Sequence, residues 1–502
     1  MTTPDDRVTP FARPFGRVRP KKELPAPSAP LAVFRALEPD WRTFDPHTKV
    51  EVPIRLFWRG DWMTWNGTHW KRTDPLAVQK ELYQITEWAK YVQDVKQDTG
   101  ERVMKSWAPN KSKISHLEHA AQAMLHQPAD LDAPAWLLDG VDYGAAVSCS
   151  NGILLLDQRQ LIAHSPVYFN ESSIPTPWTP DATCPRWRRF LSEVWPDDPK
   201  SPLLLQEWCG YVLSGRTDMQ KIMLMAGVTR SGRGTIGRVL RALLGSPSVA
   251  GPSMESFRSA FGLSTLIGKS LAIIPDARLE GRDSSSLVER LLAISGEDTI
   301  DIDRKHKDPW TGRLGTRIMM LSNELPRLKD ASAAVVGRFL ILTTKISFLG
   351  REDPHLEDQL MAELPGILNW ALEGLDRIDQ QRAFTVPDDM ADALSAMRES
   401  ASPLAAFLQE TCESGPDLSV CVEALWTEWQ QWAERNNQGA LSKAEFGRQL
   451  RAVQPAVTRR QRRNAVGKRV PSYAGLGFLP DLELCSWCGK ALGGFANHVD
   501  CK

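Results

Sequence analysis

A short apolar strand followed by a glycine-rich loop and an amphipathic helix is the feature that most constrains the fold of this chain. The expected strand covers residues 221–226, the loop covers 227–235, and apolar residues recur with helical spacing from 236 to 244. Glycines allow the backbone N–H groups of such a loop to point at phosphate oxygens, and the helix N-terminus adds positive potential. The segment predicts a Walker A nucleotide-binding loop in an α/β domain, with an ordinary glycine turn as the alternative.

This loop departs from the usual GxxxxGK[ST] pattern at two positions. Arg233 stands at the lysine position and Gly234 at the hydroxyl position, which leaves Thr235 as the candidate Mg²⁺ ligand. A guanidinium is planar and bulkier than an ammonium and does not fit the same cradle. The expected nucleotide contacts are Gly227, Val228, Thr229, Arg230, Ser231, Gly232, Arg233, Gly234 and Thr235.

Three further segments follow the loop in an order that strengthens the prediction of a nucleotide site. Residues 270–276 form an apolar strand that ends in Asp276, residues 317–323 form another that ends in Asn323, and Arg338 begins a third. An acid placed like Asp276 orders Mg²⁺ and the attacking water in such sites.

A basic hairpin is predicted between the first and second of these strands. A strand at 299–303 leads to the basic tip 304–307, and Asp308-Pro309 ends the pairing. Cations at the tip are expected to hold phosphates, with a solvated surface hairpin as the alternative. Asp301 and Asp303 are interpreted as the polar face of the strand rather than as a polymerase metal pair.

The ordered set of motifs closely resembles the superfamily 3 helicases, and within them the poxvirus and phage/plasmid primase-helicase branch. The resemblance spans roughly residues 55–480 and includes Gly296-Glu297-Asp298, residues 321–326 (LSNELP) and Gly337-Arg338-Phe339. It implies an ATP-dependent DNA helicase of phage or plasmid replication that encloses single-stranded DNA in a homohexameric ring and moves 3′ to 5′. The branch often carries a primase domain, for which this chain shows no room.

The resemblance also implies roles for individual residues. Asp276 is the Walker B acid, and together with Thr235 it is a magnesium ligand. Asn323 is the sensor that positions water or the γ-phosphate. Arg338 is an arginine finger that acts on the neighbouring subunit. The hairpin that grips DNA carries Lys305, His306 and Lys307. Arg233 and Gly234 depart from the family pattern and put the rate of hydrolysis in doubt. They therefore keep an alternative open, an origin-binding or helicase-loading protein that binds nucleotide but hydrolyses it poorly.

The region before the loop divides into an arm and a domain. Residues 1–50 are proline-rich and predict a flexible arm, whose basic residues either contact phosphate or are simply solvated. Residues 51–210 predict an α+β domain that begins with short strands at 54–58 and 61–65 and continues with helices at 77–97 and 114–126. The tryptophans here form either a base-stacking platform or the core of a small sheet.

Downstream of the expected motor domain (211–385), residues 400–480 predict three helices and a basic hairpin, the pattern of a winged-helix domain. Between 441 and 480 there are nine basic residues and one acid, a local excess typical of a phosphate-binding surface. A solvated basic loop is the alternative. The candidate DNA contacts are Arg459, Arg460, Arg462 and Arg463.

The last segment, 481–502, contains four soft ligands in CxxC…HxxC order. Cys485, Cys488, His498 and Cys501 suit tetrahedral Zn²⁺, with chance clustering of cysteines as the alternative. A site this small would be held together almost entirely by its metal.

Composition excludes few partners. The 502 residues carry 61 basic and 61 acidic side chains, so any DNA-binding surface must be local. No apolar run is long enough to span a membrane and no secretory signal is recognised. The expected location is the cytoplasm of a bacterial host, the expected cofactors are ATP, Mg²⁺ and Zn²⁺, and a separate primase or polymerase is an expected partner.

Overall fold

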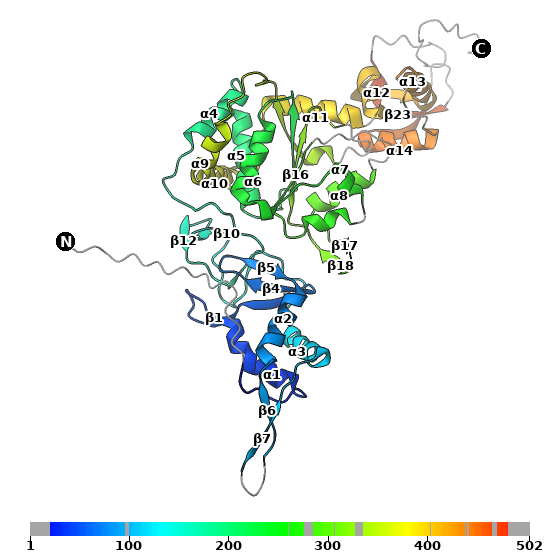
Figure 1. Ribbon diagram of the computed structural model, residues 1–502. Coiled ribbons are helices and arrows are strands. Elements are labelled where there is room, and N and C mark those ends of the chain that lie inside the picture. Colours follow the sequence, from blue (N-terminus) through cyan, green and yellow to red (C-terminus); the bar gives the residue numbers. More distant parts are fainter. Residues whose placement is uncertain are drawn as a thin grey trace, which may run out of the picture.

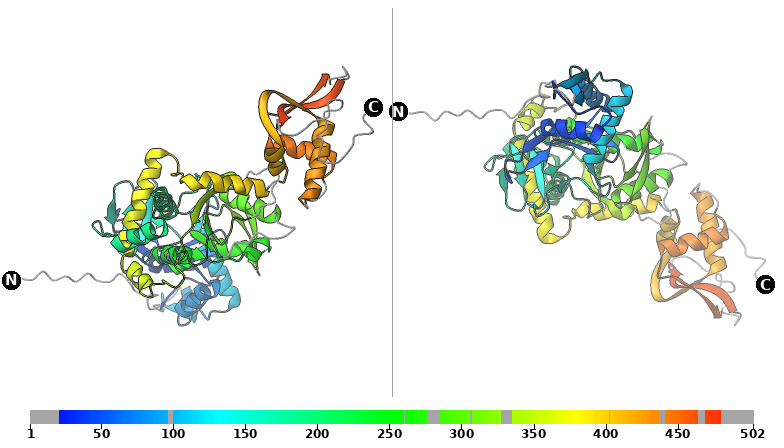
Figure 2. Two further views of the ribbon diagram at one scale, coloured as in Figure 1. Left: turned by 90° about the horizontal axis from the view of Figure 1, so that it is seen from above. Right: turned by 90° about the horizontal axis from the view of Figure 1, so that it is seen from below.

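The chain folds into an N-terminal region, a central α/β domain and a C-terminal unit. The computed structural model describes residues 21–95, 100–259, 261–275, 285–305, 307–326, 335–401, 403–436, 438, 441–463 and 469–479. Figure 1 shows the N-terminal region below the central domain, and both figures show the C-terminal unit to one side, reached through α11 (Asp388–Ala401) (Figure 2). No helix in these ranges is long and apolar enough to cross a membrane.

The N-terminal region is built on a four-stranded sheet of order β5-β4-β3-β8 with helices packed beside it. Its elements are α1 (Pro30–Leu37), η1 (Glu38–Trp41), β1 (Arg42–Phe44), β2 (Glu51–Pro53), β3 (Arg55–Trp58), β4 (Asp61–Trp65), β5 (Trp70–Thr73), α2 (Pro75–Thr86), β6 (Lys90–Val95), β7 (Arg102–Ser106), α3 (Lys111–Met124) and β8 (His126–Gln127). The two predicted strands at 54–58 and 61–65 are confirmed as β3 and β4, joined by Arg59 and Gly60 with φ of +48° and +77°. A two-residue hairpin requires such left-handed backbone.

The tryptophans of β3, β4 and β5 belong to the core of this region, where Trp65 is partly buried against Trp70. Trp58, Trp62 and Trp70 are each at most 1% exposed, and Trp58 packs edge-on against Phe169 with ring centroids 5.1 Å apart. Rings buried in this way are not available to bases, so the interpretation as a sheet core is confirmed and the stacking platform is not.

Two expectations for this region differ from the structure. The predicted arm extended to residue 50, yet α1 lies within it and buries Val33, Phe34 and Leu37 against α2 and α3, so the folded part begins earlier. Residues 90–95 were expected to continue a helix from 77 to 97. They form β6 instead and pair with β7 as an exposed hairpin, because β-branched and aromatic residues there favour a strand.

The central domain is an α/β structure around a five-stranded parallel sheet of order β15-β16-β19-β14-β20. The strands are β14 (Ile222–Gly227), β15 (Val249–Ala250), β16 (Leu271–Ile274), β19 (Arg317–Ser322) and β20 (Phe339–Thr344). The helices are α4 (Pro185–Val194), α5 (Lys200–Leu213), α6 (Arg233–Leu244), α7 (Met254–Arg258), α8 (Ser285–Ser295), α9 (Leu356–Ala362), α10 (Leu364–Gln381) and α11. The predicted strands and the helix after the loop are confirmed.

One hydrophobic core joins the sheet to segments outside the predicted 211–385 boundary. It includes residues of α4, α5 and α11 and of the small sheet β10 (Ala146–Cys149), β11 (Gly152–Leu155) and β12 (Gln160–Ile162). The α5–α10 contact is very close, since a Cβ at Gly210 would lie 2.4 Å from the Ala371 carbonyl oxygen. A helix that packs this tightly against α10 belongs to the same domain as α10. The short pair β9 (Ala135–Trp136) and β13 (Tyr168–Phe169) comes from segments that precede and follow β10–β12 in sequence.

The C-terminal unit has its own core around Phe407, Trp429 and Phe446. Its elements are α12 (Pro403–Thr411), β21 (Cys412–Cys421), α13 (Val422–Arg435), α14 (Lys443–Val453), β22 (Thr458–Arg463) and β23 (Arg469–Phe478), with sheet order β21-β23-β22. The three predicted helices and the basic hairpin are present. Strand β21 was not expected, because its Gly415-Pro416-Asp417 segment has the composition of a turn, which the structure accommodates as an irregularity in the pairing.

Candidate functional site

The glycine loop between β14 and α6 is held against its surroundings at two glycines. Gly227 has φ of +150°, and a Cβ there would lie 2.0 Å from the carbonyl oxygen of Thr344. Gly232 has φ of +88°, and its Cβ would lie 2.9 Å from Phe190 of α4. Both positions therefore require glycine. The loop is thus packed between β20 and α4, with α6 beginning immediately after Gly232.

Arg233, at the position where the pattern expects lysine, points back into the loop. Its guanidinium donates to the Val228 carbonyl oxygen at 3.0 Å, to the Ser231 hydroxyl at 3.1 Å and to Oδ1 of Asn323 at 2.8 Å. The side chain is buried, and burial lowers the pKa of Arg233 from its usual value. Arg233 therefore links the loop to the end of β19.

Asn323 lies beside the loop because the strands are parallel. Ala226 of β14 is in register with Ser322 of β19, and β16 in turn pairs with β19 through Ile274 and Met320. All three strands end at the same edge of the sheet, which is where open α/β sheets bind ligands. Asp276 follows β16 by two residues and lies outside the described residues; its neighbour Pro275 lines the cavity at this edge.

A cavity of about 480 Å³ lies over the loop and the first turn of α6. Its lining includes loop residues from Arg230 to Thr235, with Pro275, Asn323 and Phe348. Arginines outnumber carboxylates in the lining, which suits a polyanion. Three of the arginines were missed from sequence: Arg186 of α4, Arg238 of α6, and Arg351 after β20. They come from distant segments and match no local motif.

The residues present fit a nucleotide phosphate group in most respects. The glycine loop, the N-terminus of α6 and the surrounding arginines supply N–H donors and positive charge. Thr235 is half-buried on the first turn of α6, and its hydroxyl accepts from Arg238 at 3.2 Å, which leaves it capacity to ligate a cation. Gly234 is exposed and offers no side chain. The poorest fit is Arg233, whose donors already have acceptors in the loop and on Asn323.

Arg338 lies at the opposite edge of the sheet from the loop. Strand register places Phe339 beside Ile222 and Thr344 beside Gly227, so Arg338 and the loop are separated by roughly 17 Å along the strands. Its guanidinium donates to the Leu292 carbonyl oxygen at 2.8 Å and to the Ser295 hydroxyl at 2.9 Å, at the end of α8. Arg338 therefore does not reach the loop of its own chain.

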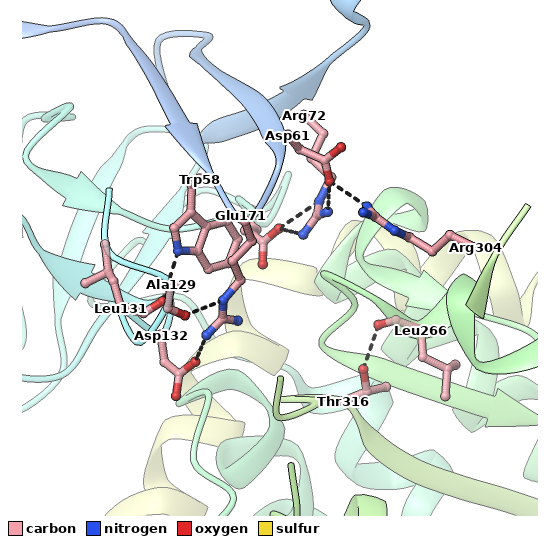
Figure 3. A network of polar contacts seen from close by, with 11 residues as sticks. Trp58, Asp61, Arg72, Ala129, Leu131, Asp132, Glu171, Leu266, Arg304 and Thr316 are labelled. Atoms are coloured by element: carbon pink, nitrogen blue, oxygen red, sulfur yellow. Dashed lines mark hydrogen bonds and ion pairs between the residues drawn. The ribbon is translucent and has the colours of Figure 1, made fainter. Parts of the chain in front are cut away.

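The predicted basic hairpin is formed by β17 (Ile300–Arg304) and β18 (Lys307–Gly312). Lys305 is exposed at the tip; His306 lies outside the described residues, and Lys307 is described by its backbone, which pairs with Arg304. This hairpin contacts the N-terminal region beside its tip (Figure 3): Arg304, the last residue of β17, pairs with Asp61 of β4 at 2.9 Å, and Asp61 also pairs with Arg72 at 2.6 Å.

The basic strand β22 forms an edge of its sheet, and all six of its residues are exposed. Side chains alternate across a strand, so Arg459 and Arg463 lie on one face and Arg460 and Arg462 on the other. Arg462 donates to the Ser419 hydroxyl at 2.8 Å. The four arginines therefore surround the edge of the sheet rather than forming a single-sided patch. The four predicted zinc ligands, Cys485, Cys488, His498 and Cys501, lie outside the described residues.

This geometry defines a class of fold and site: a parallel α/β domain that carries a glycine loop at the carboxyl edge of its sheet. Comparisons with known proteins place parts of the chain more narrowly. Residues 58–196 match the family described as D5 N terminal like, and residues 225–338 match a family of unknown function, DUF5906.

The proteins similar to this chain include one curated viral relative and two solved structures. The putative helicase 121R of Invertebrate iridescent virus 3 is 22% identical over 304 residues, covering 51% of this chain and 31% of that protein. The chain therefore spans about a third of the length of this relative. Two apo structures of the NrS-1 C-terminal region each cover 89% of this chain and 99% of their own, with TM-scores of 0.52 and 0.50 at 12% and 10% identity. At such identity the likeness shows the fold alone.

Proposed function

We propose that this protein is an ATP-dependent DNA helicase of phage or viral replication, of the superfamily 3 type. The observation that carries the proposal is the position of Asn323, bonded to Arg233 of the glycine loop at the carboxyl edge of the sheet. In a motor of this type, a polar residue at the end of the neighbouring strand contacts the γ-phosphate or the attacking water. The match to the D5 N terminal like family and the similarity to a putative viral helicase support the same function.

The proposed nucleotide site is the cavity over the glycine loop. Residues 227–235 and the N-terminus of α6 hold the phosphates, Thr235 and Asp276 hold Mg²⁺, and Asn323 positions the attacking water. Bound Mg²⁺ supplies charge neutralisation for the departing phosphate. Arg186, Arg238 and Arg351 add positive charge around the same cavity.

The proposed assembly is a homohexameric ring with a nucleotide between subunits. Arg338 lies far from the loop of its own chain, which supports a role on the neighbouring subunit. Its present partners at the end of α8 hold the guanidinium in place until that interface forms.

Single-stranded DNA is proposed to pass along the β17–β18 hairpins, with Lys305 and His306 holding phosphates and Lys307 adding charge. The C-terminal unit is proposed to be a winged-helix domain, since its elements run helix, strand, helix, helix, strand, strand. Its arginine-rich β22 would contact DNA phosphates, and residues 481–502 would bind one Zn²⁺ and recognise DNA or a partner protein.

A second function is favoured by Arg233. Its three hydrogen bonds commit the guanidinium to the loop and to Asn323 rather than to phosphate oxygens, an arrangement suited to a protein that binds ATP and hydrolyses it slowly. Such a protein would load a helicase or bind an origin.

An ATPase assay with and without single-stranded DNA separates the two functions. If the protein is a helicase, we expect Mg²⁺-dependent ATP hydrolysis that single-stranded DNA stimulates. We also expect Asp276→Ala to lose turnover and to keep nucleotide binding. Hydrolysis that DNA does not stimulate, with nucleotide binding intact, supports the loading function instead. Full turnover in Asp276→Ala would remove Asp276 from the mechanism.

A further inference from the structure

The cavity over the glycine loop has two sides of different charge. On the loop side the lining cations include Arg230 and Arg233, and the three hydrogen bonds of Arg233 go to neutral oxygens. The other side is formed by α4 and by the segment after β20, and its charged lining residues are Arg186, Glu193, Arg351, Glu352 and Asp353. Three carboxylates outweigh two arginines on that side. Phosphates are therefore directed to the loop, and the second side is left for the uncharged parts of a nucleotide.

The second side is held together by ion pairs. Arg186 of α4 pairs with Glu193 at 3.5 Å and with Asp353 at 3.6 Å, and its Nε donates to the side-chain oxygen of Gln359 at 3.1 Å. The guanidinium is thus committed to protein groups. The lining residues on this side that have no polar side chain, above all Phe348, then decide what part of a ligand fits there.

Phe348 is fixed against the glycine loop by hydrogen bonds. Its N–H donates to the carbonyl oxygen of Arg230 at 2.8 Å, and the hydroxyl of the preceding Ser347 donates to the carbonyl oxygen of Thr229 at 2.9 Å. A turn follows, in which the N–H of Arg351 donates back to the carbonyl oxygen of Phe348 at 2.8 Å. The aromatic ring therefore has a fixed place beside the residues expected to hold phosphates.

The ring of Phe348 is half-buried and divides its surface between the core and the cavity. It packs against the core of the central domain and lines the cavity together with Leu356, the first residue of α9. The next residue, Leu349, is 69% exposed, so the turn places one apolar side chain inward and the other in solvent. The guanidinium of Arg351 lies 5.9 Å from the centroid of the Phe348 ring. A nucleobase offers the flat surface that stacks on such a ring.

We propose that Phe348 stacks on the base of the bound nucleotide, with Leu356 as a second apolar contact. The ribose then lies between this base subsite and the glycine loop, and the phosphates lie on the loop. The inference rests on the proposed nucleotide site, and it adds the place of the base and the residue that holds it. Phe348 belongs to no nucleotide-binding motif in the sequence, and parallel pairing of β20 with β14 brings it to the loop.

The test compares ADP with pyrophosphate, which carries the same phosphates without ribose or base. Each is titrated with Mg²⁺ into the full chain and followed by calorimetry. We expect the wild type to bind ADP more tightly than pyrophosphate. In Phe348→Leu the affinity for ADP falls about fivefold or more, as for a lost base–aromatic contact, while the affinity for pyrophosphate is unchanged.

Two further variants serve as controls. Phe348→Tyr keeps an aromatic ring and should bind both ligands as the wild type does. Phe261→Leu makes the same substitution at a phenylalanine that is 53% exposed and lies outside the described lining of the cavity. Its affinities for ADP and pyrophosphate stay those of the wild type.

Photolabelling of the wild type tests the same subsite without a variant, and it applies even if Phe348→Leu fails to fold. ADP that carries an azide on its base should label the segment 347–356, as located by mass spectrometry of peptides, and unmodified ADP should prevent the labelling. Labelling confined to other segments would overturn the proposal.

The proposal is also overturned if Phe348→Leu binds ADP as tightly as Phe261→Leu, or if its affinities for ADP and pyrophosphate fall by the same factor. The same holds if the wild type binds pyrophosphate as tightly as ADP. A wild type that binds neither ligand lacks the nucleotide site altogether, and that result removes the proposed function together with this inference.

Discussion

Arg304 and Asp61 join two parts of the chain that are 243 residues apart, with Nη1 of Arg304 2.9 Å from Oδ2 of Asp61. Both side chains are largely buried, 13% and 7% exposed, and the same carboxylate holds Arg72. Figure 3 shows this network beside Ala129 and Asp132. Arg59 donates to the Ala129 carbonyl oxygen at 2.7 Å and to Asp132 at 2.6 Å. The basic hairpin is thus anchored to the N-terminal region beside its tip, at Arg304, while the neighbouring Lys305 is exposed.

Replacing Asp61 by asparagine should loosen this anchor. Asp61→Asn leaves two guanidinium groups around a neutral amide, and we expect a loss of about 1–3 kcal/mol in the free energy of unfolding. Asp132→Asn is the matched control, because Asp132 also pairs with two arginines but is 43% exposed. Chemical denaturation of both variants measures the difference. An Asp61→Asn protein no less stable than Asp132→Asn would contradict the anchoring role.

Arg233→Lys should keep nucleotide binding and give turnover equal to or above that of the wild type. A lysine ammonium fits the cradle of the loop and releases the bond that holds Asn323. Arg233→Met, which has neither charge nor donor, should weaken nucleotide binding at least about tenfold. Nucleotide affinity and kcat of the two variants are the measurements. If lysine is as damaging as methionine, Arg233 does not occupy the lysine position.

Arg338 should act on the nucleotide of a neighbouring subunit. Arg338→Ala and Asp276→Ala are each expected to lack turnover, since a trans arginine contributes about 10³- to 10⁵-fold in rate where one is used. A mixture of the two proteins should recover part of the ATPase activity, because a mixed ring contains some interfaces with both groups. The absence of recovery at every mixing ratio, with rings verified, would instead support a structural role for Arg338 at the end of α8.

The segment 481–502 should bind one zinc ion per chain. Elemental analysis of protein purified without chelator tests this, and Cys485→Ser should lose the metal. A chain ending at residue 481 should keep basal ATPase activity and bind DNA or a partner protein more weakly. Zinc content near zero in the wild type would show that the cysteines cluster by chance.

Sequence patterns predicted most of the central sheet, because each strand there is a short apolar run with a recognisable end. The positions of Asn323 beside the loop and Arg338 away from it follow from parallel pairing of those strands. The basic hairpin was also predicted, but Asp308-Pro309, which was expected to end its pairing, lies inside β18, and the pairing with β17 continues to Gly312.

Contacts between distant segments could not be predicted in this way. The pairing of Arg304 with Asp61 and the arginines that α4 and α6 bring to the cavity depend on tertiary packing, for which no local motif exists. The helices that share a core with the sheet could not be predicted either: most of α5 and all of α11 lie outside the predicted range 211–385, yet they bury apolar residues in the core of the parallel sheet. Strand β6 was not predicted because its apolar and polar residues alternate only weakly and most of its side chains are exposed.

The central claim is that ATP turnover drives DNA unwinding through the β17–β18 hairpin, and it is tested most directly with a forked duplex. The wild type, with rings verified, should separate the strands with ATP and Mg²⁺, and Asp276→Ala should not. Lys305→Ala combined with His306→Ala should bind nucleotide and assemble normally, yet lose unwinding and the stimulation of ATPase by single-stranded DNA, because sequence-independent phosphate contacts are removed. Binding of the fork by wild-type rings without strand separation, or normal unwinding by the double variant, would contradict the account.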